Sequence, residues 1–365
     1  MDMLINGTAA TAADETWIEV KNPATGEYID KVPRGSKEDV NAAVETADAA
    51  FGEWSEKTTR DRGLILCRAA ELIRRDHKDL ARLLTQEQGK PIRESTDEIR
   101  GCANILEYYA SIAGQPDGEA ICLGKAGDCL VTRVPLGVCA AIIPWNMPVI
   151  IMGWKVGPAL LAGNTLVLKP SSATPLTNLK ISGLLQEAGL PAGVLNVVTG
   201  PGETTGAALV QHPRVKKISF TGDGATGRRI REMTQDHIRT LTLELGGSDP
   251  MIVMADADIP KAVEGALGAG STTPARSVPQ SNGCTCTRRS QRSSYTCSRQ
   301  KWKVSRSETD SCRVRIWDHS TAQNNSGGSV RWSVKRPGGR KGRSGPGVVR
   351  SRDPDSKRVF SLNRP

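Results

Sequence analysis

Apolar residues in the first third of the chain recur at helical spacing. They follow an entry segment, 4–35, that reads as short extended pieces joined by turns. Ser36 with Asp39 three residues later is the signature of a capping box, which predicts a helix start. The predicted amphipathic helices cover 36–51, 59–84 and 92–113.

From Val131 onward the pattern changes to short continuous apolar runs that alternate with helical stretches. The runs lie at 138–143, 165–168, 194–198 and 217–220. The helical stretches lie near 149–162, 177–189, 203–211 and 225–235. Continuous apolar runs are typical of parallel strands buried on both faces. Repeated strand–helix–strand units therefore predict an α/β fold with a doubly wound, Rossmann-like sheet.

A further strand-like stretch, 240–245, alternates and carries Glu244 near its end, before Gly246 and Gly247. Glycines have no Cβ, so they let the backbone pass close to a ligand. This stretch is the most specific candidate for a site in the chain.

Charge divides the chain into two parts. The net charge is +10 overall, but residues 271–365 carry +16 and residues 1–270 carry −6. The first 270 residues have the charge of an ordinary soluble domain. The tail is rich in Ser, Arg, Thr and Gly without apolar periodicity, and we expect it to be disordered.

Membrane and metal sites are not expected. No run of about 18 apolar residues occurs and the N-terminus lacks a secretion signal, which predicts a cytoplasmic protein. The five cysteines before residue 270 lack metal-binding spacing, so we interpret them as buried reduced thiols. The tail cysteines have no paired His, which disfavours a zinc site.

Polar residues gather where the predicted strands end. The loop from Gly222 to Gly227 opens a helix directly after a strand and could bind a phosphate, although a simple turn would look the same. Lys169 could reach a ribose hydroxyl or remain a surface lysine. Asn146 could donate to an oxyanion or only form a turn. Glu244 could be a general base or a salt-bridge partner.

These pieces together make the chain resemble the aldehyde dehydrogenase superfamily over about residues 1–270. The matching motifs are Asn22-Pro23-Ala24-Thr25-Gly26, Glu87-Gln88-Gly89-Lys90-Pro91, Pro144-Trp145-Asn146-Met147-Pro148, Lys155 with Pro158-Ala159-Leu160, Gly163-Asn164-Thr165, Leu168-Lys169-Pro170-Ser171, Phe220-Thr221-Gly222 and Leu243-Glu244-Leu245-Gly246-Gly247.

The resemblance implies oxidation of an aldehyde to its acid with NAD or NADP. It implies that a Cys thiolate attacks the aldehyde, that Asn146 donates to the oxyanion and that Glu244 activates water. The implied cofactor-binding residues are Pro144, Trp145, Lys169, Ser172, Phe220, Thr221, Gly222, Gly227, Leu245 and Gly246.

Two residues depart from the family pattern. Ser172 stands where NAD-preferring members often have a ribose-binding Glu, which would leave room for a 2′-phosphate and favours NADP. Asp223 stands where the family usually has Ser beside the pyrophosphate, and an anion there should repel phosphate unless it turns away.

The resemblance also implies domains. Residues 1–246 would form the N-terminal and cofactor-binding domain, with an oligomerisation hairpin at about 122–137. Residues 247–270 would begin the catalytic domain, and 271–365 would be a non-homologous tail. Intact family members form homo-oligomers. Whether this chain does stays open, because the tail replaces the C-terminal strand that they exchange.

The nucleophile is absent from its expected place, since residue 278 is Val and no family Cys loop surrounds it. Permitted codons for 270–287, read one base earlier, encode RFHNAGQVCTAVKRLYMY, which contains the family's F-x-N-x-G-Q-x-C loop. Our hypothesis is that the chain from about residue 271 is translated out of frame and lacks activity.

Other functions remain open. A catalytically dead, dinucleotide-binding pseudoenzyme is one, and nucleic-acid binding by the basic tail is a less favoured one, because the tail has no binding motif. For the intact family member we expect a small aldehyde or semialdehyde as substrate, with succinate semialdehyde as the first guess.

Overall fold

The computed structural model describes residues 1–115, 118–247, 250–254, 256–258, 260–262 and 264–265, with three short strands further on. The contacts between residues divide the chain into two compact units, Met1–Gly246 and Gly247–Pro365. The functional division into domains made from the sequence stays a prediction.

A seven-stranded sheet in the order β11-β10-β7-β8-β9-β1-β2 forms the centre of the first unit. Its parallel strands are β7 (Val138–Ile142), β8 (Thr165–Lys169), β9 (Leu195–Val197), β10 (Lys217–Gly222) and β11 (Thr240–Leu245). Two strands of the entry segment extend the sheet: β1 (Met3–Ile5) pairs antiparallel with β9, and β2 (Thr8–Ala10) pairs antiparallel with β1. The predicted α/β fold with a mainly parallel sheet is confirmed.

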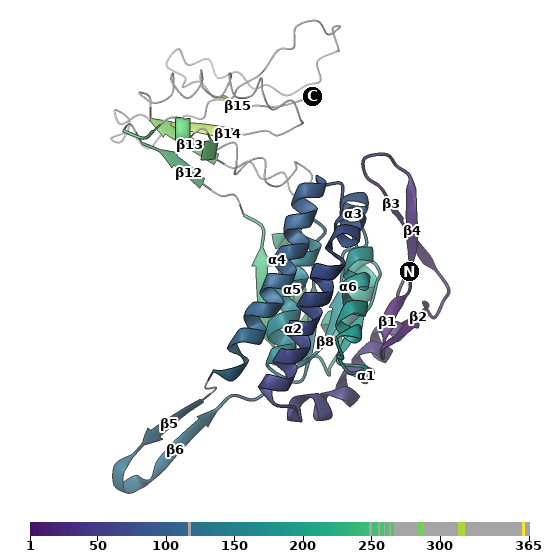
Figure 1. Ribbon diagram of the computed structural model, residues 1–365, viewed down its shortest axis with the longest axis vertical. Helices are drawn as coiled ribbons and strands as arrows, with labels where there is room; N and C mark the ends of the chain where they lie inside the picture. The colour runs from purple at the N-terminus through teal and green to yellow at the C-terminus, as the bar shows by residue number, and fades with distance from the viewer. Residues whose placement is uncertain are drawn as a thin grey trace, which may run out of the picture. The chain divides into compact units, whose positions relative to one another are not determined.

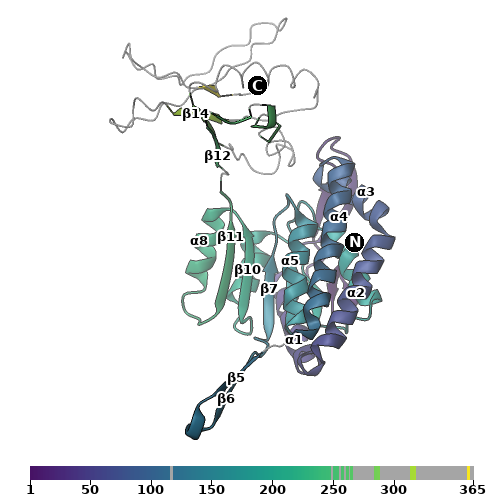
Figure 2. The ribbon, with the colours of Figure 1, turned by 60° about the vertical axis from the view of Figure 1, so that its left-hand side comes forward.

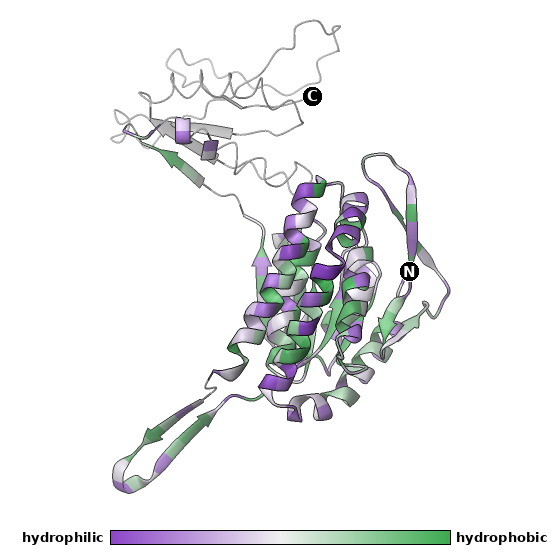
Figure 3. Ribbon diagram, viewed as in Figure 1, coloured by the Kyte–Doolittle hydropathy of each residue, from purple (hydrophilic) through white to green (hydrophobic). Residues whose placement is uncertain are grey.

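Helices cover both faces of this sheet (Figures 1 and 2). One face packs against α1 (Lys37–Glu56), α7 (Ala207–Gln211) and α8 (Gly224–Met233). The other packs against α5 (Pro148–Leu161) and α6 (Leu176–Glu187), with α2 (Thr59–Arg75), α3 (His77–Gln88) and α4 (Ile92–Ser111) outside them. In Figure 3 hydrophilic and hydrophobic residues alternate along α2 and α4, as expected for amphipathic helices.

The single helix predicted over 59–84 is two helices that meet at Asp76. The backbone of Asp76, at φ −96° and ψ 9°, leaves the helical conformation. Asp competes with the backbone for hydrogen bonds and disfavours helix interiors. Apolar spacing continues through both helices, so the pattern alone could not reveal the break.

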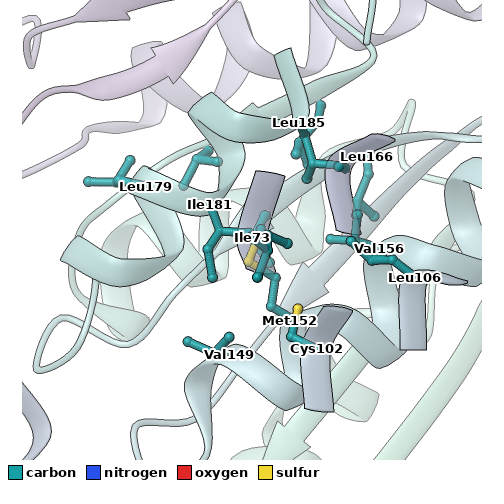
Figure 4. Close-up of a cluster of buried hydrophobic side chains, with 14 of the residues drawn as sticks. Ile73, Cys102, Leu106, Val149, Met152, Val156, Leu166, Leu179, Ile181 and Leu185 are labelled. Atoms are coloured by element: carbon teal, nitrogen blue, oxygen red, sulfur yellow. The ribbon is translucent and has the colours of Figure 1, made fainter. Parts of the chain in front are cut away.

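Alternate residues of the strands build two separate cores. Leu166 and Leu168 of β8 face the core under α5 and α6, whereas Val167 faces the core under α1. Figure 4 shows the first core, where Ile73 and Met152 from two helices lie among the other apolar side chains. Burial on both faces explains why these strands read as continuous apolar runs.

Two hairpins lie outside the main sheet. One pairs β3 (Trp17–Lys21) with β4 (Tyr28–Pro33). The other pairs β5 (Gly118–Cys122) with β6 (Asp128–Thr132), and every residue of its strands is exposed. It begins earlier than the hairpin predicted at about 122–137, and its role in oligomerisation stays a prediction.

The second unit contains a sheet of β12 (Pro250–Val253), β13 (Gly283–Thr287), β14 (Arg313–Trp317) and β15 (Phe360–Ser361). The last three strands fall in the tail for which we expected no regular structure. The runs of β13 and β14 include β-branched residues, which favour extended backbone. The expectation for the rest of 271–365 lies outside the described residues.

Acidic side chains of α3 and α4 fix the starts of α6 and α5. The Glu87 carboxylate accepts hydrogen bonds from the backbone N–H groups of Leu176 (2.8 Å) and Thr177 (2.9 Å). The Glu98 carboxylate accepts from those of Val149 (2.8 Å) and Ile150 (3.1 Å). Two acidic side chains thus satisfy helix N-termini that follow neighbouring strands.

Lys90 completes this arrangement. Its ammonium forms an ion pair with Glu98, and the two side chains are only 3% and 2% exposed. It also donates a hydrogen bond to the backbone carbonyl of Asn146 at 2.8 Å. The loop after β7 is therefore held by a charge that is itself neutralised inside the protein.

Replacing Lys90 with Met should destabilise the first unit by about 3–5 kcal/mol, because Glu98 would keep a buried charge without its cation. Urea denaturation monitored by circular dichroism measures this change. Arg82→Met is the matched control, since the Arg82–Asp79 pair is exposed and its loss should cost below about 1 kcal/mol. Equal stability of the two variants would contradict the assigned role of Lys90.

Glu87 should make stability depend on pH. Burial raises the pKa of Glu87 from 4.5 to about 7, outweighing the hydrogen bonds that favour its ionised form. The folded protein then binds more protons than the unfolded chain between these values, so stability falls as pH rises through this window. In Glu87→Gln this fall should be smaller when denaturation is measured at several pH values from 4.5 to 8. A constant difference from the wild type would mean that Glu87 is ionised throughout.

Candidate functional site

The carboxyl ends of the five parallel strands meet at one edge of the sheet. The chain adds β8 and β9 on one side of β7 and then returns to place β10 on the other side. The crevice between β7 and β10 is thus the topological switch point, where open α/β sheets bind ligands. Pro144, Trp145 and Asn146 follow β7 there, and the loop from Gly222 follows β10.

The register of β10 and β11 brings several predicted site residues together. Thr221 pairs with Glu244, and Gly222 pairs with Leu245. The backbone N–H of Gly246 donates to the carbonyl of Gly222 at 3.0 Å. The residues predicted from two distant motifs are therefore neighbours on adjacent strands.

The two faces of this strand pair differ sharply in polarity. Ile218, Phe220, Leu241 and Leu243 point to the core that contains α8. The residues that alternate with them are all polar: Lys217, Ser219, Thr221, Thr240, Thr242 and Glu244. Glu244 is exposed on this polar face. The face turned toward α5 is therefore suited to chemistry rather than to packing.

Lys155 of α5 reaches this polar face. Its Nζ donates to the Ser219 hydroxyl at 2.7 Å, and the residue is 8% exposed. Burial lowers the pKa of Lys155 to about 8, against an opposing effect of Glu244, and Lys217 lowers it further. The sequence had offered Lys155 only as part of a motif. Its position as the single charged residue of the apolar helix α5 was a signal that could have singled it out.

Asn146 is half-buried, and two side chains donate hydrogen bonds to its backbone carbonyl. Its carbonyl accepts from Lys90 and, at 3.4 Å, from the side chain of Gln88. Its side-chain oxygen is buried without a hydrogen-bond partner among the described residues. This oxygen can only accept, so a donor to an oxyanion would have to be the side-chain NH₂ group.

Lys169 lies beside Gly206, on the face of the sheet opposite to the polar face of β10 and β11. It is 4% exposed, and its ammonium donates to the Pro170 carbonyl at 3.1 Å. Burial lowers the pKa of Lys169 to about 8. Its ammonium has three donors, so polar ligand atoms could use the remainder. Ser172 nearby in sequence donates to the Gly200 carbonyl at 2.8 Å.

Close packing requires glycine at two positions of the Gly222 loop. A Cβ on Gly222 would lie 2.5 Å from the Phe220 ring, and one on Gly227 would lie 2.6 Å from the Leu245 side chain. The second contact lets α8 approach the end of β11 closely. Both positions belong to the predicted cofactor site, but packing alone accounts for their lack of a side chain.

Asp223 turns back onto its own helix. Its carboxylate accepts from the backbone N–H groups of Ala225 (2.9 Å) and Thr226 (3.0 Å) and from the Thr226 hydroxyl (2.6 Å). These hydrogen bonds, with that from the Thr226 hydroxyl first, lower the pKa of Asp223. The carboxylate therefore occupies N–H groups that a phosphate at this helix end would use.

The cysteines of the first unit are poor candidates for the nucleophile. Burial raises the pKa of Cys102 to about 12 and that of Cys139 to about 11, so both remain thiols. The expectation that all five are buried is wrong for Cys122 and Cys129, which are exposed on the β5–β6 hairpin, and Cys67 is only half-buried. Every residue of both strands of this hairpin is exposed, which the sequence pattern could not reveal.

A separate hollow of about 840 Å³ lies among α1, α7 and the short π-helical turn η3 (Gly202–Gly206). None of the predicted site residues lines it. Among the described residues there is no group of His, Cys, Asp and Glu able to hold a metal ion. No helix in the described part of the chain is long and apolar enough to cross a membrane.

The chain is similar to several known proteins. It is 43% identical over 266 residues to the succinate-semialdehyde dehydrogenase [NADP(+)] GabD of Escherichia coli, covering 72% of this chain and 55% of that protein. It is 42% identical over 270 residues to a betaine aldehyde dehydrogenase of Bacillus subtilis, covering 73% and 55%. A solved structure of PnpE in complex with nicotinamide adenine dinucleotide is 36% identical with a TM-score of 0.79, covering 81% and 61%.

The chain thus spans little more than half the length of these curated relatives. The family model described as "Aldehyde dehydrogenase family" matches residues 9–289, which leaves 290–365 outside the match. Together with the α/β fold and the strand-end motifs, this match shows that the chain belongs to the aldehyde dehydrogenase family.

Proposed function

We propose that residues 1–246 bind NADP in preference to NAD and that the chain as written does not oxidise aldehydes. The observation that carries this proposal is the arrangement at the sheet edge. Lys169, Ser172 and the Gly222 loop belong to one side of the edge, and Asn146 and Glu244 belong to the other. One side suits a dinucleotide and the other suits a reacting carbonyl.

Lys169 fits a bound dinucleotide, whereas Asp223 does not. The Lys169 ammonium, buried with a carbonyl acceptor, could donate to ribose hydroxyls. The dinucleotide, when bound, supplies the hydride acceptor. Asp223 already occupies N–H groups at the start of α8, so we expect weaker pyrophosphate binding than a Ser there would allow.

Asn146 and Glu244 would act on the substrate. The Asn146 side-chain amide would donate to the aldehyde oxygen as negative charge develops on it. Glu244, exposed on the polar face, would take a proton from the water that hydrolyses an acyl intermediate. Lys90 would support the first role, since it holds the Asn146 backbone.

Formation of that acyl intermediate requires a nucleophile that the chain lacks at its expected place. Position 278 is Val. The sequence translated in the shifted reading phase contains the family's Cys loop, and its Cys codon overlaps the codons of Ser277 and Val278. The out-of-frame hypothesis therefore accounts for both the missing Cys and the basic, Arg-rich tail.

The preference for NADP rests on Ser172. A short hydroxyl that donates to Gly200 leaves no carboxylate to bind a ribose 2′-hydroxyl or to repel a 2′-phosphate. For the intact enzyme we propose a small aldehyde or semialdehyde as substrate. Similarity to the NADP-named succinate-semialdehyde dehydrogenase supports both proposals.

The exposed β5–β6 hairpin supports a proposal on assembly. An isolated two-stranded hairpin is marginally stable in water. Its exposed apolar residues include Ile121, Leu130 and Val131. We propose that it pairs with a second copy in intact family members. The oligomeric state of this chain depends on whether the tail can replace the C-terminal strand that those members exchange.

Purified full chain should bind NADPH without turning over aldehyde. NADPH fluorescence should rise on titration, and addition of succinate semialdehyde with NADP⁺ should give no absorbance at 340 nm above a heat-killed sample. Aldehyde-dependent NADPH formation would contradict the absence of a nucleophile. Failure to bind either dinucleotide would contradict the proposed binding function.

Two lysines make a matched pair for this test. Lys169→Met should weaken NADPH binding by about tenfold or more, because a buried charged donor to the ligand is lost. Lys180→Met, at an exposed position on α6, should leave it unchanged. Ser172→Glu should weaken NADPH more than NADH. Equal effects of the two lysine variants would remove Lys169 from the site.

A further inference from the structure

We propose that Lys155 is a nucleophile toward aldehydes in this chain: its amine condenses with a small aldehyde to form an imine on the polar face shared with Glu244. The inference rests on the proposed aldehyde site, but it requires neither a bound dinucleotide nor the missing Cys.

The position of Lys155 provides the geometry. Its side chain crosses from α5 to β10, where Nζ lies 2.7 Å from the Ser219 hydroxyl. Ser219 and Thr221 alternate on the same face of β10, and Glu244 lies opposite Thr221 on β11. A Lys amine, hydroxyl groups and a carboxylate therefore share one polar face at the sheet edge.

Burial and two charged groups determine the protonation of this amine. Burial favours the neutral form, and the Lys217 ammonium on β10 acts in the same direction. Lys217 is itself held by a hydrogen bond of 2.8 Å to the Thr242 hydroxyl. Glu244 on β11 acts in the opposite direction, favouring the ammonium. Because the pKa of Lys155 is lowered to about 8, its neutral fraction at pH 7 is roughly two orders of magnitude above that of an ordinary lysine.

The reaction balances without an added reagent. The neutral amine attacks the carbonyl carbon, forming a C–N bond while the C=O π bond breaks. The Glu244 carboxylate takes one proton from the nitrogen and delivers it to the oxygen, which gives the carbinolamine. It then takes the second N–H proton and delivers it to the hydroxyl as the C–O bond breaks and water leaves. Aldehyde and amine thus give imine and one water, with no change in oxidation state.

Lys169 provides an internal comparison. It is also buried, and its pKa is also lowered to about 8. Burial is the cause there, and no carboxylate contributes to the shift. If a lowered pKa were sufficient, both lysines would react; if a neighbouring acid–base group matters, Lys155 reacts faster.

The test is reductive trapping on the purified full chain. Propanal and sodium cyanoborohydride are added at pH 7, and the rate of propylation at each lysine is followed by peptide mapping and mass spectrometry. Lys155 should be modified about tenfold faster than the exposed Lys37, Lys78 and Lys180, and faster than Lys169. Modification of Lys155 no faster than that of the exposed lysines overturns the inference.

Glu244→Gln separates proton transfer from a merely structural role. Across pH 6 to 10, its limiting rate at Lys155 should fall about tenfold, because the proton acceptor is lost. The midpoint should also move to lower pH, because the carboxylate no longer stabilises the ammonium. An unchanged limiting rate overturns the role of Glu244. Lys155→Met must lose the adduct while the three reference lysines react as before.

NADPH binding measured on the same sample separates this inference from the proposed function. Binding with an unreactive Lys155 overturns the imine alone. A reactive Lys155 without NADPH binding supports the imine and contradicts the binding function.

Discussion

The ion pair between Lys90 and Glu98 holds together parts of the molecule that come from three different places in the sequence. Glu98, on α4, binds the first N–H groups of α5, and Lys90 binds the carbonyl of Asn146 just before that helix. Since both charges are almost fully buried, neither can be solvated if the other is removed. The helical layer thereby fixes the loop at the end of the central strand β7, and with it one wall of the candidate site.

The sheet edge is divided by the alternation of its strands. Residues of β10 and β11 that face α8 are apolar and complete a core, whereas those that face the other way are polar. The candidate groups for carbonyl chemistry lie on the polar face, and Lys169 lies on the opposite side beside Gly206. The two faces of the sheet edge therefore carry different candidate groups.

Much of the first unit could be predicted from the sequence because burial dictates its pattern. The parallel strands appeared as apolar runs, and the capping box at Ser36 and Asp39 marked the start of α1 as observed. The break at Asp76 could not be predicted, since amphipathic spacing continues across it. The exposure of Cys122 and Cys129 was missed because nothing in their local pattern indicates that both strands of the hairpin are exposed.

The sequence predicted which candidate residues lie at strand ends, but it did not predict the contacts that their side chains make. The spacing of motifs placed Asn146, Lys169 and Glu244 at one edge of the sheet. It could not reveal that Asp223 folds back on α8 or that Lys155 meets Ser219, because these depend on side-chain directions set by tertiary packing. Motif residues with no chemical role assigned, such as Glu87 and Lys90, bind the start of α6 and the loop after β7.

We propose that a change of reading phase removes the nucleophile of this family member. The genomic nucleotide sequence across codons 265–300 tests this proposal directly. The bases around codon 278, read one base earlier, should encode the loop F-H-N-A-G-Q-V-C. Bases that encode no such loop in the shifted phase would contradict it.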